Sequence, residues 1–215
     1  MTLRSRSAES IIETLIAITV IVLSSAAALS MLRTALRGNY VIGEKLVALE
    51  LALEGLDAVK NIRDSNYLLF ASDADTCWNK LGLTLSSDCA TATAITDGEE
   101  YYLIQNFSNA PLYRWNMQLA VTDTDGFMDL FEYTDSTGTT VPLYSDRHNS
   151  SVSGFSSVDA NAFKRLISID YDPLDSAGND LCPEDTCFEA TVTVEWSLAE
   201  ITQNVSLTRL ISHVY

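Results

Sequence analysis

The sequence predicts an α+β protein in which a long N-terminal α-helix packs on a C-terminal antiparallel β-sheet head. Residues 11–32 are an almost unbroken apolar run, and residues 42–56 repeat apolar side chains at helical spacing. Beyond residue 66, short segments alternate apolar and polar side chains, as half-buried strands do. The 215 residues, of which 47% are hydrophobic and 20% charged, suit one folded domain with an appendage.

Charge divides the chain into a weakly basic beginning and a strongly acidic remainder. Residues 1–39 hold four basic and two acidic side chains, a net charge of +2, whereas residues 40–215 hold nine and 27, a net charge of −18. An acidic surface repels phosphate, so we expect no direct nucleic-acid binding by the head. The same balance argues against docking on an anionic membrane through a polybasic patch.

The apolar run from Ile11 to Leu32 is long enough to cross a bilayer as a helix. Arg4 and Arg6 precede it, so the positive-inside rule predicts a cytoplasmic N-terminus and an exported head. Glu13 is the only charged residue of the run. A carboxylate at membrane depth is a functional candidate by default. The alternative is that the Glu13 side chain reaches up to the polar interface of the membrane. A cleaved signal peptide and a plain signal anchor are the other interpretations, but signal peptides have apolar cores of only roughly 7–15 residues.

A second helical pattern follows the apolar run. Apolar side chains recur at steps of three and four residues, with polar side chains between them, at Ile42, Leu46, Leu49, Leu53 and Leu56. No proline occurs before Pro111, and Asp64-Ser65-Asn66 is a suitable helix end. We therefore predict one helix over residues 10–64, about 80 Å long. Its membrane or assembly half is residues 9–32, and its amphipathic half is residues 33–66.

The head, residues 67–215, is predicted to be mostly antiparallel sheet. Its alternating segments are residues 101–105, 115–121, 127–133, 163–171, 190–196 and 204–211. Asp125-Gly126 predicts a turn that joins the second and third segments as a hairpin. Residues 134–160 are rich in Ser, Thr, Gly and Asp and are predicted to form a long surface excursion.

The four cysteines all lie in the head. An even count in an exported segment predicts two disulfides, and we prefer the local pairs, Cys77 with Cys89 and Cys182 with Cys187, among the three connectivities. A four-thiolate zinc site is the alternative, although the spacings lack short Cys-x₂₋₄-Cys pairs on both sides.

Catalytic patterns are scarce, so we expect no enzymatic activity and no cofactor. The sequence has two histidines in unrelated contexts, no glycine-rich phosphate loop and no Gly-x-Ser-x-Gly elbow. A calcium-loop pattern places carboxylates at its positions 3, 5, 9 and 12, here Asp123, Asp125, Asp129 and Glu132. Position 1 is Val121, which offers no side-chain ligand, and the same residues fit the hairpin turn. The hairpin is our preferred interpretation, and calcium is the alternative.

The segment from Ala8 to Glu13 resembles the start of the type IV pilin family, including the pseudopilins of type II secretion. Members of that family have a short basic leader, a small residue before the scissile bond and a Glu at the fifth mature position. Here Arg4 and Arg6 match the leader, Ala8 the residue before the cut, Glu9 the first mature residue and Glu13 the fifth-position Glu. The family prefers Gly where Ala8 stands and an apolar residue where Glu9 stands.

This resemblance implies a leader over residues 1–8 that a membrane prepilin peptidase removes, with methylation of the new amine. It also implies that the subunit waits in the inner membrane and is then moved by an assembly platform into a pilus or pseudopilus. There Glu13 is expected to pair with an N-terminal amine among the packed helices of other pilin subunits. The ending, Val194-Glu195-Trp196 and a second Thr/Ser/Leu strand, is similar to minor pilins. The alternatives are an adhesin or ligand-binding module on the filament and an unrelated signal-anchored extracytoplasmic domain.

Overall fold

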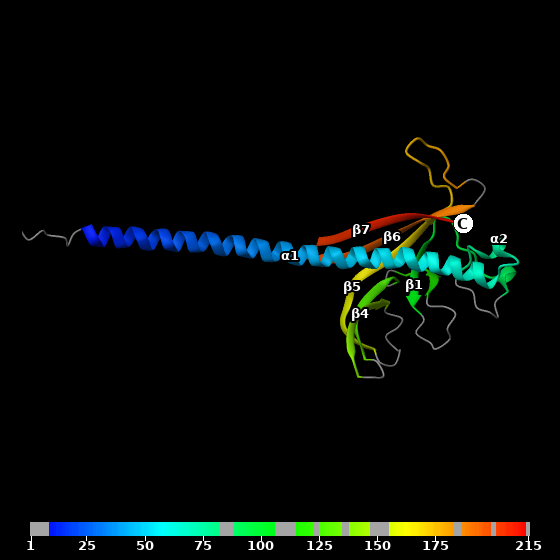
Figure 1. The fold of residues 1–215 in the computed structure, drawn as a ribbon, viewed down its shortest axis with the longest axis horizontal. Helices are drawn as coiled ribbons and strands as arrows, with labels where there is room; N and C mark the ends of the chain where they lie inside the picture. The colour runs from blue at the N-terminus through cyan, green and yellow to red at the C-terminus, as the bar shows by residue number, and fades with distance from the viewer. Residues whose placement is uncertain are drawn as a thin grey trace, which may run out of the picture. The chain divides into compact units, whose positions relative to one another are not determined.

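The computed structural model describes residues 9–81, 88–105, 115–122, 125–134, 138–146, 155–182, 186–198 and 201–213. The chain divides into two compact units, Met1–Lys45 and Leu46–Tyr215. Helix α1 spans Glu9–Leu69 and belongs to both units (Figure 1). The other elements are α2 (Ala74–Cys77), the 3-10 turn η1 (Cys89–Thr91), β1 (Glu100–Gln105), β2 (Trp115–Leu119), β3 (Phe127–Thr134), β4 (Thr140–Asp146), β5 (Phe155–Asp170), β6 (Cys187–Leu198) and β7 (Ile201–Ser212).

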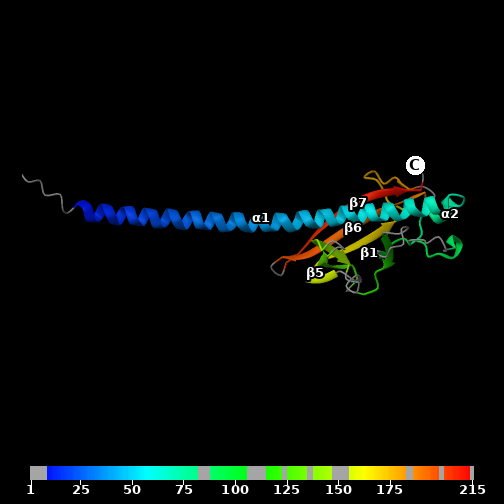
Figure 2. The ribbon, with the colours of Figure 1, turned by 60° about the horizontal axis from the view of Figure 1, so that its bottom comes forward.

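The structure confirms the predicted fold class, because a long N-terminal helix packs on an antiparallel sheet. All strand pairings among the described residues are antiparallel. The part of α1 from Leu46 onward lies along one face of the sheet, with β6 and β7 beside it in both views (Figure 2). The second compact unit therefore contains the end of the helix together with the head.

The 16-residue strand β5 is the centre of the sheet. One of its edges pairs with β1 near its C-terminal end and with β3 along its N-terminal half, and β2 and β4 extend the sheet beyond them. Its other edge pairs with β6 only from Lys164 to Asp170, and β7 lies outside β6. The strand order is therefore β2-β1-β5-β3-β4, with β6 and β7 on the opposite side of β5.

The buried face of α1 differs from the predicted leucine stripe. Ile42, Leu46 and Leu53 are more than half exposed, whereas Leu56 of the stripe is buried as predicted. The face that meets the sheet combines small and large apolar residues, at Ala48, Leu51, Ala52, Gly55, Leu56, Ala58, Val59 and Ile62. A Cβ atom at Gly55 would lie 2.8 Å from Val192 Cγ1, so only glycine permits this approach. Small residues let the helix axis lie close to the strands, and this close packing outweighs the greater hydrophobicity of leucine.

Helix α1 also ends five residues later than predicted, at Leu69. Asn66 does not stop it, because its buried side-chain amide donates hydrogen bonds to the carbonyl oxygens of Trp78 (3.4 Å) and Lys80 (2.8 Å). Backbone carbonyl groups of the segment after the helix thus accept the hydrogen bonds of Asn66, a residue type that in the sequence alone indicates a helix end.

The excursion predicted over residues 134–160 is wrong, since it contains β4 and the beginning of β5. Strand β4 pairs with β3 from Thr140 to Asp146, beyond a turn at Gly138, which has φ +83°. Threonine and valine favour strands, and Pro142 is tolerated because β4 lies at the edge of the sheet. The Ser and Thr residues that were interpreted as a loop signal therefore belong in part to an edge strand.

Candidate functional site

The first part of α1 presents an apolar surface on every side. Each large apolar side chain between Ile11 and Leu36 is more than half exposed. The helix is long and apolar enough to cross a membrane. Several of its hydroxyl groups bond within the helix, as Thr14 donates to the Ile11 carbonyl at 2.9 Å and Thr19 to the Ile16 carbonyl at 2.8 Å. Such a surface is stable only in lipid or against other apolar surfaces.

Glu13 is the one charged side chain within this apolar surface, between Ile11 and Leu32. It is exposed, and no cation of the described residues lies within ion-pair distance of it. Of the predicted cleavage residues, Glu9 is the first residue of α1, and Ala8 lies outside the described residues. Among the described residues, Glu13 thus has no cationic partner.

Arg165 on β5 joins the second part of α1 to the sheet. Its guanidinium group is 3% exposed and donates to the Leu51 carbonyl (3.2 Å) and to Glu54 Oε2 (3.1 Å). Its Cζ atom also lies 5.6 Å from the centre of the Trp115 ring. A buried guanidinium group is stable only with such partners, so Arg165 fixes the position of the helix on the head.

Both predicted disulfides are formed with the preferred local connectivity. Cys77 at the end of α2 is bonded to Cys89 in η1, and Cys182 is bonded to Cys187 at the start of β6. The four sulfur atoms are therefore not available as thiolates, and the zinc alternative does not apply. Each bridge restrains a segment that has little regular structure of its own.

The acidic run after β2 forms a turn, although not the predicted hairpin. Asp125 Oδ2 accepts hydrogen bonds from the amides of Val121 (2.7 Å) and Thr122 (2.8 Å), and the Gly126 carbonyl accepts one from Arg165 N (2.7 Å). The last of these bonds directs the chain onto the edge of β5. Strand β3 therefore pairs with β5 and β4, while β2 pairs with β1.

The calcium candidates do not form a ligand set in the part of the chain that the structure describes. Asp123 lies outside that part. Asp129 is buried and Glu132 is exposed on β3, and these two carboxylates do not converge with that of Asp125. The hydrogen bonds of Asp125 to Val121 and Thr122 give its carboxylate a role in the turn.

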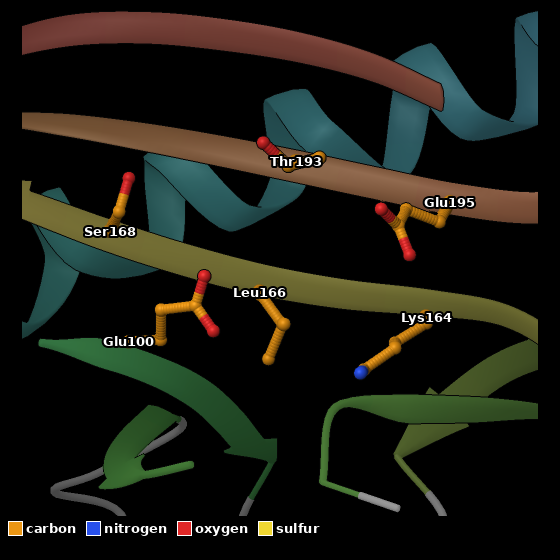
Figure 3. Close-up of a pocket in the computed structure, with 6 residues that line it drawn as sticks. All are labelled: Glu100, Lys164, Leu166, Ser168, Thr193 and Glu195. Carbon is orange, nitrogen blue, oxygen red and sulfur yellow. The ribbon is translucent and has the colours of Figure 1, made fainter. Parts of the chain in front are cut away.

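Two adjoining hollows lie at the sheet, and no motif or spacing in the sequence predicts either of them. The first, of about 100 Å³, lies on the face opposite α1, and Figure 3 shows the six side chains that line it: Glu100, Lys164, Leu166, Ser168, Thr193 and Glu195. The second, of about 290 Å³, shares Lys164 and Glu195 with the first. The residues come from different strands, and only the register of β5 with its neighbours brings them together.

Comparisons of the chain with protein-family models, with curated proteins and with solved structures find no match. The apolar helix, its single carboxylate and the disulfide-bonded head are thus the basis for a functional proposal.

Proposed function

We propose that this chain is a type IV pilin-like subunit, of the minor pilin or pseudopilin kind, which enters a filament through the first half of α1. The observation that supports the proposal most strongly is the apolar surface of residues 11–32, which is exposed on every side and interrupted by one carboxylate. A membrane anchor needs the apolar surface but gains nothing from the carboxylate. A helix that leaves lipid and packs among the helices of other subunits needs the apolar surface for packing and can use the carboxylate for pairing.

The outer face of the second half of α1 agrees with this role. Ile42, Leu46 and Leu53 are each more than half exposed. Exposed apolar side chains on a helix that also has an apolar N-terminal part favour contact with neighbouring subunits. The exposed members of the predicted stripe, Ile42, Leu46 and Leu53, are then a surface between subunits, whereas Leu56 and the small residues serve the fold of one subunit.

Glu13 has a specific function in this proposal. After removal of residues 1–8, the chain begins at Glu9, one helical turn before Glu13. The new α-amine and the Glu13 carboxylate, of the same or of neighbouring subunits, neutralise each other in a medium without water. The pairing fixes the axial position of one helix against the next. The partners implied are prepilin peptidase, an inner-membrane assembly platform and other pilin subunits.

The first test is mass spectrometry of the N-terminus of the protein isolated from cells. We expect the mature chain to start at Glu9, with a methylated amine, because the peptidase cuts after Ala8. A chain that keeps Met1 or starts at Thr2 would contradict the proposal and leave a signal-anchored domain. A start near residue 30 would also contradict it, since ordinary signal-peptide cleavage removes the apolar half of α1.

A filament-displayed binding module is the second candidate function, and the two hollows on the head favour it. The acidic head suits neutral or cationic partners better than nucleic acid. Deletion of this subunit distinguishes the candidates: loss of filaments indicates a role in assembly, and normal filaments that no longer bind indicate display.

A further inference from the structure

The larger hollow lies in a fork between two strands. Strands β5 and β6 pair as far as Lys164 and Glu195, which are directly opposite each other and form the last pair of their ladder. Beyond this pair, β5 continues beside β3, whereas β6 continues to Leu198 beside β7. The hollow of about 290 Å³ opens where the two strands separate. This volume is near the lower end of the about 300–1,000 Å³ typical of ligand pockets.

Aromatic rings form the apolar part of the fork. The rings of Phe163 and Trp196 lie 6.2 Å apart between centroids and are almost completely buried. Phe127 is half-buried, and the ammonium group of Lys164 lies 5.7 Å from the centre of its ring. Phe127 is therefore the most exposed ring of the hollow, and its apolar surface, backed by the two buried rings, suits a ligand with C–H groups.

The polar groups of the fork include hydrogen-bond donors and acceptors. Lys164 offers only donors and Glu195 only acceptors, and within the described part of the chain these two side chains form no ion pair with each other. The hydroxyl-bearing residues Ser197 and Thr202 are opposite each other on β6 and β7 and also line the hollow. A ligand rich in hydroxyl groups, each of which both donates and accepts, matches this mixture.

The indole N–H of Trp196 points to a ligand independently of the lining as a whole. The Trp196 side chain lines the hollow and is 6% exposed, yet its Nε1 atom has no acceptor among the described residues. Leaving a buried donor unpaired costs about 1–3 kcal/mol, so native structures rarely tolerate it. An acceptor from outside the described residues, such as an oxygen atom of a ligand in the hollow, would pair this donor.

We propose that the fork binds a neutral glycan, with one sugar ring against its aromatic wall and the next ring over Leu166 in the adjoining hollow. Glu195 and the net charge of −18 on residues 40–215 disfavour an anionic ligand, and Lys164 disfavours a cationic one. A neutral sugar ring is repelled by neither charge. Its C–H face matches the apolar part of the fork, and its hydroxyl groups match the polar part. The proposal goes beyond filament assembly and does not depend on it.

The test uses the full chain in a detergent that has no sugar headgroup. Lactose, maltose and N,N′-diacetylchitobiose are titrated and followed by tryptophan fluorescence and by ligand-observed NMR. We expect at least one of them to bind with a Kd of about 1 mM or tighter. The anionic counterpart sialyllactose is expected to bind at least about tenfold more weakly than lactose, because its carboxylate brings a like charge to Glu195.

Variants locate the binding in the fork. Glu195→Gln and Trp196→Phe are each expected to weaken the binding about tenfold, since the first replaces a charged acceptor with a weaker neutral one and the second removes a donor. Glu189→Gln is the matched control, because Glu189 lies on the same strand but lines neither hollow. Glu195 is partly exposed, so its variant tests the site even where Trp196→Phe disturbs the packing.

Three results would overturn the proposal. The first is no binding of any of the three neutral sugars at about 10 mM, tenfold above the expected Kd. The second is binding that Glu195→Gln and Trp196→Phe leave unchanged. The third is capture of an extended peptide in the fork, lost in the same two variants, with no sugar competing for it.

Discussion

Glu13 is the residue at which the proposed function is most sensitive to substitution. We expect Glu13→Leu to reach the membrane like the unaltered chain, because the substitution makes the helix more apolar. We expect its incorporation into filaments to fall by at least about tenfold, because removing one partner of a buried ion pair costs roughly 3–5 kcal/mol. The measurement compares the membrane fraction with filaments sheared from the cell surface.

The matched control for Glu13 is Glu50→Leu, which removes an exposed carboxylate from the same helix within the part that packs on the head. We expect this variant to assemble normally. Normal assembly of Glu13→Leu, or an equal loss in both variants, would contradict the pairing proposed for Glu13.

Single residues differ in how far the sequence reveals their roles. The connectivity of Cys77, Cys89, Cys182 and Cys187 followed from count and spacing, because short loops close most readily. The sequence alone also identified Glu13 as a charged residue within an apolar segment. Arg165 was not recognisable, because its partners Leu51 and Glu54 are more than a hundred residues away in sequence. Only the folded chain shows that this arginine is buried.

At the scale of one element, β7 allows a test of the hydrogen-bond register. The His213 amide donates to the Thr186 carbonyl (3.0 Å), and the pairing of β6 with β7 continues without a shift to Leu198 and Ile201. Alternation along an antiparallel ladder therefore directs the Gln203 amide towards β6 and the Asn204 amide away from it. The two neighbouring positions differ in backbone bonding although both side chains are polar.

We expect Gln203→Pro to lower the free energy of unfolding by about 1–3 kcal/mol more than Asn204→Pro, because only the former removes a ladder hydrogen bond. Urea denaturation followed by tryptophan fluorescence measures both variants. Equal losses, or a larger loss for Asn204→Pro, would show that the register is shifted by one residue.

Elements were predictable where their hydrophobic pattern was local. The alternation of residues 190–196 and 204–211 identified β6 and β7, and the apolar run identified α1. The buried face of α1 was not identified, because Ala48, Ala52 and Gly55 give a weaker hydrophobic signal than the leucines opposite. Strand β4 was missed since its Thr140–Asp146 segment has the composition of a loop. Packing distance and strand pairing, neither of which is local, decided these cases.

For the whole molecule, the candidate assembly helix was predictable and the fork was not. A membrane-length apolar segment is a property of consecutive residues. The fork depends on β5 extending beyond its ladder with β6, which is a property of three strands. A hollow that forms where two strands stop pairing is therefore recognised only from the topology of the sheet. This explains why the sequence indicated a membrane anchor but not a ligand site.

The distribution of buried residues predicts that the head is independent of the apolar half of α1. Every member of the main hydrophobic core lies at or beyond Ala48, and the second compact unit begins at Leu46. We expect a chain of residues 46–215 to fold with both disulfides, to stay soluble without detergent, and to unfold at the temperature at which the head of the full chain unfolds. Circular dichroism and differential scanning calorimetry measure this, and an unfolded or markedly less stable fragment would contradict it.

A fragment that starts at Asp57 is the matched comparison for residues 46–215. It lacks Leu51, whose carbonyl accepts from Arg165, and Glu54, which pairs with the same guanidinium group. It also lacks Gly55 and Leu56, so the core face of the sheet loses part of its cover. A buried charge that has lost two of its partners and an uncovered core each cost several kcal/mol, roughly the whole stability of a domain. We therefore expect this shorter fragment to remain unfolded, which would place the structural boundary of the head inside α1, between Lys45 and Asp57.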